Sequence, residues 1–294
     1  SRFFMLLTLV LGAITGVGIW FAIALVNPAG TSALINTFVW GWASEWAFFI
    51  IEIAAAMVYY YGWERLDARR HEMVGWIYFI SAWMSLFIIN GIISFQLTPG
   101  DWPATRNVWD GFFNPTYYPS LLLRTGIAML MATAFMLWPA MKASKEARPK
   151  LARYLGIWAV IGSLVSYAGY RWWEGALPET VQSLFLGDGA LLAGLVDTRW
   201  LVMWSITAAL LLAILFLIAL PKTAKVIPVL LFTIAAFTFF GAYERLREGT
   251  RKPFIIHDYM FSNGVLVSEV EALNENGILS KARWAARVPA EDSV

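Results

Sequence analysis

Two carboxylates share one face of a long apolar segment near the start of the chain. Glu45 and Glu52 are seven residues apart, which on a helix places them two turns apart on the same side. A charge at membrane depth is costly and therefore points to function. We expect the pair to relay protons or to meet a cation on a neighbouring helix, unless Glu45 lies at the outer water interface and is simply solvated.

Histidine is scarce in this chain. There are two, His71 and His257, and neither lies in an apolar segment. A b-type haem in a membrane takes axial ligands, usually neutral imidazole. We therefore expect no haem b within this chain. His71 is expected to be structural or solvated. His257 is expected either to serve a haem carried by a partner, as ligand or hydrogen-bond donor, or to be a surface residue.

A single cation lies inside another apolar segment. Arg124 is about seven residues into the run 117–141. At that depth it needs a carboxylate, a propionate, carbonyl groups or water, and a structural ion pair is the simplest arrangement. No cluster of residues suggests a bound metal ion.

Membrane-spanning helices must position these side chains. The chain of 294 residues is 59% hydrophobic and only 14% charged, whereas a soluble domain carries about 25% charged residues. About 20 apolar residues cross a bilayer as a helix, and runs this long do not suit barrel strands. We predict an all-α fold, a polytopic transmembrane helical bundle with a short extramembrane C-terminal tail. Seven spans are expected, at residues 3–26, 40–62, 73–95, 117–141, 155–172, 200–220 and 226–243.

Composition excludes several functions. The net charge of +2 is too small for nucleic-acid binding. Cysteine is absent, which rules out disulfides, thiolate catalysis, iron–sulfur ligation and covalent c-type haem attachment within this sequence. The sequence begins Ser-Arg and ends in AEDSV, and we expect both ends to be cut or processed.

The distribution of Lys and Arg predicts the orientation. The connections on the side of residue 1 carry eleven basic residues, whereas the opposite connections carry only Arg106, Arg171 and Arg199. The positive-inside rule places residue 1 in the cytoplasm of a bacterium, in a multi-pass protein of the plasma (inner) membrane. Residues 1–243 then form the membrane domain, and 244–294 form a periplasmic tail. The apolar stretch 181–194 is too short to span and is expected to be interfacial or re-entrant.

The tail is mixed polar and apolar. The stretch VSEVEALNENGILSKARWAAR is typical of a short amphipathic helix, a Gly turn and a second short helix. It is too small to bury a core of its own. We expect it to lie against a partner or against the outer loops, the alternative being a floppy extension.

Several blocks of sequence resemble subunit I of the cytochrome bd quinol oxidases. The blocks come in family order and cover most of residues 10–260. They are GAITGVGIWF, a helix closing in YYYGWERL, ARRHEMVGW, SLFIINGI, FFNPTYYPSLLLRTG and EGTRKPFII. The resemblance implies a bd-type helical fold.

The resemblance to the cytochrome bd family also implies roles for particular residues. Glu52 falls on the family's second proton-channel carboxylate, and the first falls on Ser44, with Glu45 beside it. Arg199 matches an arginine that neutralises a haem propionate. Glu248 matches the carboxylate near the high-spin haems, and Arg251 matches the arginine of the family's Gly-Arg-Gln-Pro signature. Arg124, Arg199, Glu248, Arg251 and His257 are therefore candidate cofactor-binding residues.

For the function, the positions at which the chain departs from the family matter more than the positions that match. The family's low-spin haem takes a His where this chain has Arg124, and its Met ligand falls near Leu201. The His of the high-spin haem lies on a helix that precedes this sequence, and the long outer quinol loop is reduced to about 171–198. The resemblance therefore implies this type of fold without the low-spin haem.

Three functions remain open. In the first, the chain binds quinol near the outer face and passes electrons to c-type haems, on a periplasmic multihaem or monohaem cytochrome c or beyond residue 294. Quinol oxidation needs a base near water, and the candidates are Glu174 and Glu179, with Trp172 and Trp173 packing on the ring or anchoring the interface. In the second, the chain is a haemless structural subunit that anchors further membrane subunits. In the third, it is part of a bd-type quinol:oxygen oxidase.

Overall fold

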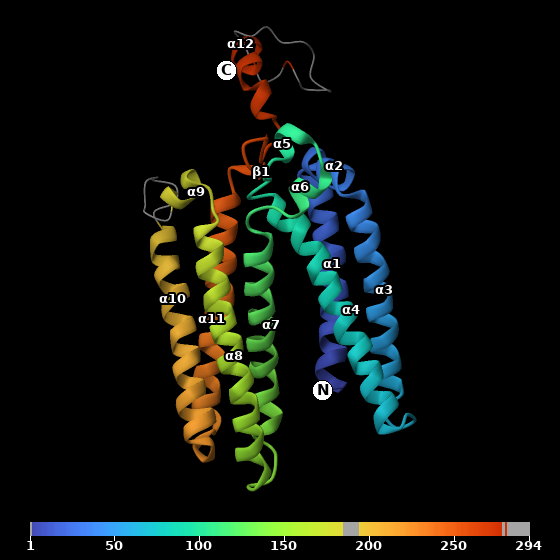
Figure 1. Ribbon diagram of the computed structural model, residues 1–294, viewed down its shortest axis with the longest axis vertical. Coiled ribbons are helices and arrows are strands. Elements are labelled where there is room, and N and C mark those ends of the chain that lie inside the picture. Colours follow the sequence, from blue (N-terminus) through green and yellow to red (C-terminus); the bar gives the residue numbers. More distant parts are fainter. Residues whose placement is uncertain (1, 185–193, 278–279, 281–294) are drawn as a thin grey trace.

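Seven long apolar helices run side by side and confirm the predicted all-α bundle (Figure 1). The computed structural model describes residues 2–184, 194–277 and 280. Each of the seven helices is long and apolar enough to cross a membrane. Their bounds are α1 (Arg2–Val26), α3 (Val39–Tyr61), α4 (Ala68–Phe95), α7 (Tyr117–Ala140), α8 (Ala147–Gly175), α10 (Gly194–Leu212), which continues as a π-helical stretch (Ala213–Ala219), and α11 (Val226–Arg251).

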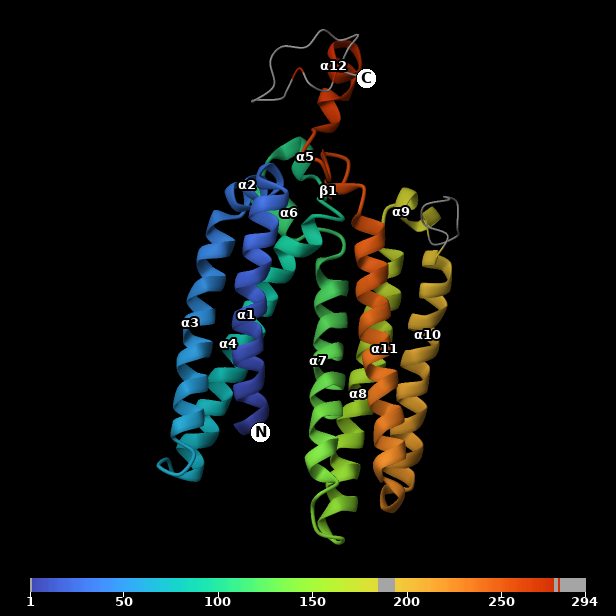
Figure 2. The ribbon, with the colours of Figure 1, turned by 180° about the vertical axis from the view of Figure 1, so that it is seen from behind.

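Most of the short elements gather at one end of the bundle, opposite the N-terminus (Figures 1 and 2). We call this the hairpin end, after the antiparallel pair β1–β2 that lies there. The elements are α2 (Pro28–Thr37), α5 (Trp102–Thr105), α6 (Val108–Phe112), α9 (Glu179–Leu184), β1 (Phe254–Ile256), β2 (Met260–Phe261), a 3-10 turn (Val267–Glu269) and α12 (Val270–Asn276).

Helices α7 and α8 approach closely because small residues face each other. A Cβ placed on Gly126 would lie 2.5 Å from the Oγ of Ser166. A Cβ on Gly169 would lie 2.5 Å from the backbone nitrogen of Leu123. Small residues at helix interfaces allow this packing in membranes, where lipid gives no hydrophobic drive between helices. Together with α10 and α11, these helices enclose the larger apolar core.

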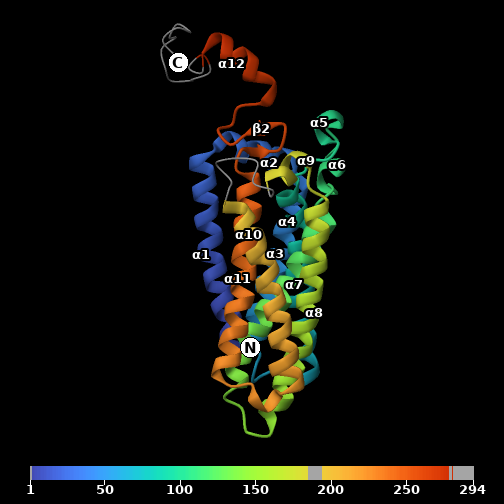
Figure 3. The same cartoon turned by 90° about the vertical axis from the view of Figure 1, so that its left-hand side faces the viewer.

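Helices α1, α3 and α4 form a looser group beside this core. They lie on one side of α7 in Figures 1 and 2, while α8, α10 and α11 lie on the other. The most apolar window of α1 is 0% buried within the chain, against 50% for α7. The bundle is also much narrower from the side (Figure 3). Much of α1 therefore faces lipid or another subunit.

Three helices extend at one end by six or more residues beyond the apolar runs predicted. Helix α8 begins at Ala147, α10 begins at Gly194 and α11 ends at Arg251, eight residues past Tyr243. The added turns of α11 are held by ion pairs three residues apart, between Glu244 and Arg247 and between Glu248 and Arg251. Residues 244–251 thus continue the last helix rather than starting the tail.

The tail packs first on the connections at the hairpin end and then leaves the bundle. The backbone N–H of His257 donates to Gln96 at 2.8 Å, and the guanidinium of Arg106 lies over the ring of Tyr259 at 4.5 Å. Helix α12 and a Gly turn follow, with Gly277 at a φ of 77°. The predicted second tail helix and most of the 181–194 stretch lie outside the described residues.

Candidate functional site

The carboxylate of Glu174 lies near the hairpin end of α8, between two guanidiniums. Nη1 of Arg171 donates to it at 2.6 Å and Nε of Arg199 at 2.5 Å. The hydroxyl of Tyr170, one turn earlier, donates at 3.4 Å. Glu174 is buried, whereas the side chain of Arg171 is half exposed. We call these four residues the Glu174 cluster. It is a buried carboxylate flanked by two cations, of which Arg171 is half exposed.

A second polar group lies between α7 and α11. Nη2 of Arg124 lies 3.8 Å from Glu244, which also pairs with Arg247 at 2.8 Å. Tyr243 is completely buried beside them. Its hydroxyl and the Nε of Arg124 have no hydrogen-bond partner among the described residues. Arg124 was predicted to need a partner at this depth, and in the structure it lies beside Glu244.

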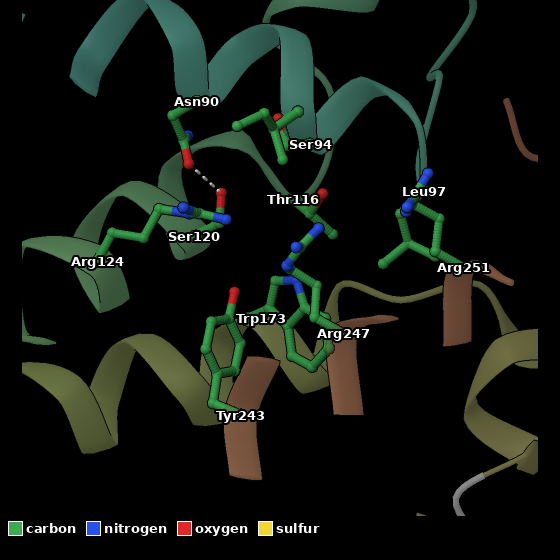
Figure 4. Close-up of a pocket in the computed structure, with 11 residues that line it drawn as sticks. Asn90, Ser94, Leu97, Thr116, Ser120, Arg124, Trp173, Tyr243, Arg247 and Arg251 are labelled. Carbon is green, nitrogen blue, oxygen red and sulfur yellow. Dashed lines mark hydrogen bonds between the residues drawn. The ribbon is translucent and has the colours of Figure 1, made fainter. Parts of the chain in front are cut away.

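We call Arg124, Tyr243, Glu244 and Arg247 the Arg124 cluster. Three of its members, Arg124, Tyr243 and Arg247, border a narrow slot together with residues of α4 (Figure 4). Tyr243 and Arg247 point from α11 toward the residues of α4 and α7. On the facing side, Ser120 donates to the Oδ1 of Asn90 at 2.8 Å, and the Nδ2 of Asn90 donates to the carbonyl of Tyr117. The space left is ≈ 10 Å³, about the room of one water molecule. The slot has room for a water molecule, and so for proton transfer through that water, but it is too small for a quinone ring.

Trp173 lies between the two clusters, and its ring is 6.3 Å from that of Tyr170 between centroids. The rings of Trp173 and Tyr243 meet edge to face, with their centroids 5.5 Å apart. Trp173 is buried, whereas Trp172 is 53% exposed, so the two tryptophans point to different surroundings. Only Trp172 is placed to contact a molecule in the membrane.

The other predicted residues are distributed over the molecule. Glu179 is exposed in the first turn of α9. Glu248 is half exposed and lies 3.6 Å from Arg251. Arg251 lines both the polar slot and a large apolar pocket beside α1. Arg199 contacts Glu174 of its own chain. The structure therefore brings Arg251 to the Arg124 cluster and Arg199 to the Glu174 cluster.

The two histidines occupy different settings. The ring of His71 stacks on Tyr59 with centroids 4.1 Å apart, and its Nε2 lies 3.1 Å from the carbonyl of that residue. This is the expected structural role. His257 is buried, with Nδ1 3.2 Å from Asp258. The interpretation of His257 as a surface residue is therefore wrong, because the hairpin packs it against Phe254 and against Gln96 at the end of α4.

Glu45 and Glu52 lie on α3, in the looser group of helices. Glu45 accepts a hydrogen bond from Ser85 of α4 at 2.7 Å and borders a pocket with Trp20, Trp42 and Trp46. Both carboxylates are partly buried. The Ser85 bond binds α3 to α4, so Glu45 is engaged within the bundle rather than only solvated.

The residues present do not fit a haem b. Arg124 in α7 is paired with Glu244 and offers no haem ligand. His257 lies above the helices in the hairpin, and His71 is stacked at the opposite end. Within the described part of the chain, no three His, Asp or Glu side chains converge as in a metal site.

Part of the site has a sequence signal that the prediction did not use. Tyr243, Arg247 and Arg251 are spaced by four, which places them on one face of a helix. The assignment of residues after 243 to the tail concealed that face. Glu244 had no such signal, because its partner Arg124 is distant in the sequence.

The sequence matches no known family model and no curated protein.

Proposed function

We propose that the chain is a membrane subunit of a respiratory electron-transfer complex in a bacterial plasma membrane. It takes electrons from quinol near the outer membrane face and delivers them to c-type haems on a periplasmic partner. The observation that carries the proposal is the buried Glu174 carboxylate, held between Arg171 and Arg199 at the hairpin end of the bundle.

Quinol oxidation defines what this site must do. A quinol gives up two protons and two electrons and becomes a quinone. The Glu174 carboxylate accepts the hydrogen bond of one quinol hydroxyl and takes its proton, which then passes to water past the half-exposed Arg171. The second hydroxyl releases its proton to water directly. The guanidiniums of Arg171 and Arg199 favour the negative charge that develops on the quinol oxygen. The electrons leave singly to the haems of the partner.

The position of the cluster supports release on the outer side. The Glu174 cluster lies at the hairpin end, and the connections at the opposite end carry most of the basic residues. Under the positive-inside rule the hairpin end faces the periplasm. A periplasmic cytochrome c has access to this end, which also carries the tail.

A second candidate, the anchoring subunit, is favoured by one observation. Helix α1 is almost entirely exposed within the chain, as expected for a surface that further membrane subunits cover. In this case the Glu174–Arg199 ion pair holds α8 to α10, and Glu174 takes no part in proton transfer.

The test is quinol-dependent reduction of the cytochrome c partner, measured in the intact complex and normalised to the amount of complex. Glu174→Gln should lower turnover at least tenfold while assembly is kept. Glu179→Gln tests the other candidate base, and Glu72→Gln at the exposed opposite end is the matched control. Full turnover in Glu174→Gln and Glu179→Gln would contradict the electron-transfer proposal and leave the anchoring role.

A further inference from the structure

We propose that the apolar pocket between α1, α2 and α4 binds one acidic phospholipid. An acyl chain lies along α1, and the phosphate meets Arg251. This inference does not depend on the proposed function, because it concerns a different pocket and a lipid that is not consumed.

The pocket has the size and lining of a site for an apolar chain. Its volume is ≈ 630 Å³, within the range of about 300–1,000 Å³ found for ligand pockets. Its walls come from α1, α2, α4 and the hairpin. Apolar side chains and one glycine form its deeper part: Gly16, Ile19, Trp20, Ile23, Ile89 and Ile92.

The polar lining residues lie near the hairpin end, where Gln96 caps α4. Asn27 and Thr31 follow α1 at the hairpin end, and Ser262 belongs to the hairpin itself. Asn27 already donates to the carbonyl of Ser262 at 2.6 Å, and Thr31 donates to that of Ile23 at 3.0 Å. Arg251 is the charged residue of the lining. The pocket is therefore an amphiphile site with one cation at its mouth.

The depth of the pocket matches one leaflet. It runs along α1 from Gly16 to Val26, which at the rise of an α-helix is about 15 Å. The hydrocarbon core of a bilayer is about 30 Å thick. A chain that lies in the pocket with its headgroup at the mouth thus spans the half of the membrane on the hairpin side.

The surroundings of the Arg251 guanidinium favour binding of an anion. Its Nε is buried and has no hydrogen-bond partner within the described residues. Its neighbour one turn earlier is Arg247, a like charge, and its carboxylate partner Glu248 is 3.6 Å away and half exposed. A phosphate accepts two parallel hydrogen bonds from a guanidinium and supplies the missing charge. A neutral quinone headgroup supplies no charge, so the phospholipid is the better fit.

Two pairs of variants test the two ends of the pocket. A Cβ on Gly16 meets nothing within 4 Å, so Gly16→Phe fills the pocket without a backbone clash. Gly12 has equally open space but does not line the pocket, so Gly12→Phe is its control. Arg251→Gln removes the cation, and Lys252→Gln removes the same charge from the exposed next residue.

The full chain is purified from membranes, exchanged into detergent with phosphatidylglycerol or phosphatidylcholine, and examined by native mass spectrometry. We expect one phosphatidylglycerol per chain in the parent and both controls, at least tenfold less in Gly16→Phe and Arg251→Gln, and no comparable retention of phosphatidylcholine. An excess of inorganic phosphate should leave the lipid bound. Equal retention in Arg251→Gln and Lys252→Gln, displacement by phosphate, or a bound quinone in place of the phospholipid would overturn the proposal.

Discussion

Nε of Arg199 lies 2.5 Å from Oε1 of Glu174 and joins α10 to α8. The carboxylate is nine-tenths buried, and Arg199 is about one-third exposed. The other partner, Arg171, is half exposed and belongs to the same helix as Glu174. The Arg199 contact is therefore the one that connects two helices at the candidate site.

A double-mutant cycle on this pair should give a clear coupling energy. We expect about 2 kcal/mol between Glu174→Gln and Arg199→Gln in the free energy of unfolding, because the pair is largely desolvated. The same cycle with Arg171→Gln should give under about 1 kcal/mol, since that side chain is half exposed. Reversible unfolding in mixed micelles measures both cycles. Equal coupling energies would contradict the claim that Arg199 is the stronger partner of Glu174.

Removal of Glu244 should destabilise the chain more than removal of Arg124. Glu244 contacts both Arg124 and Arg247, so Glu244→Gln leaves two like charges without their anion. We expect a loss of about 2–3 kcal/mol for Glu244→Gln and about 1 kcal/mol for Arg124→Gln. Unfolding free energies measure the order. Glu275→Gln in exposed α12 is the control. A larger loss for Arg124→Gln than for Glu244→Gln would contradict the assignment of Glu244 as the shared ion-pair partner.

Gly169 should not tolerate a methyl group. Its Cβ would approach the backbone nitrogen of Leu123 to 2.5 Å, so Gly169→Ala must push α7 away from α8. We expect a loss of about 2 kcal/mol. Gly241→Ala on α11, where the new Cβ meets nothing within 4 Å, should be neutral or stabilising by up to about 1 kcal/mol. Thermal unfolding followed by circular dichroism separates the two, and similar melting temperatures would refute the close packing.

The membrane part of the fold was predictable from hydropathy, but the helix ends were not. Long apolar runs reveal spans because the bilayer requires about 20 such residues. The last turns of α11 carry Glu244, Arg247, Glu248 and Arg251, which hydropathy assigns to water. Ion pairs between neighbouring turns extend the helix there, and a composition window does not detect them.

The candidate site was predictable only in part. Arg124 was predicted to need a partner, but Glu244 is 120 positions away and only the packing of α11 on α7 brings it close. The setting of Glu174 likewise depends on α8 meeting α10. The pocket beside α1 is a gap between several helices, which no local pattern encodes.

The absence of cysteine permits a direct test of orientation. Single cysteines at Lys145 and Ser268 occupy exposed positions at opposite ends of the bundle. In intact cells without an outer membrane, a membrane-impermeant maleimide should label Ser268→Cys at once and Lys145→Cys only after lysis. Labelling of Lys145→Cys alone would reverse the orientation, and labelling of both would contradict an odd number of spans.

The central claim is that quinol electrons reach outer c-type haems without a haem b in this chain. The most direct measurement is the time-resolved absorption spectrum of the intact complex after mixing with quinol, together with a pyridine haemochrome of the purified chain. The account predicts reduction of haem c by quinol, slowed at least tenfold in Glu174→Gln, and no b-type spectrum from this chain. A b-type spectrum from the purified chain, or haem c that quinol does not reduce, would contradict it.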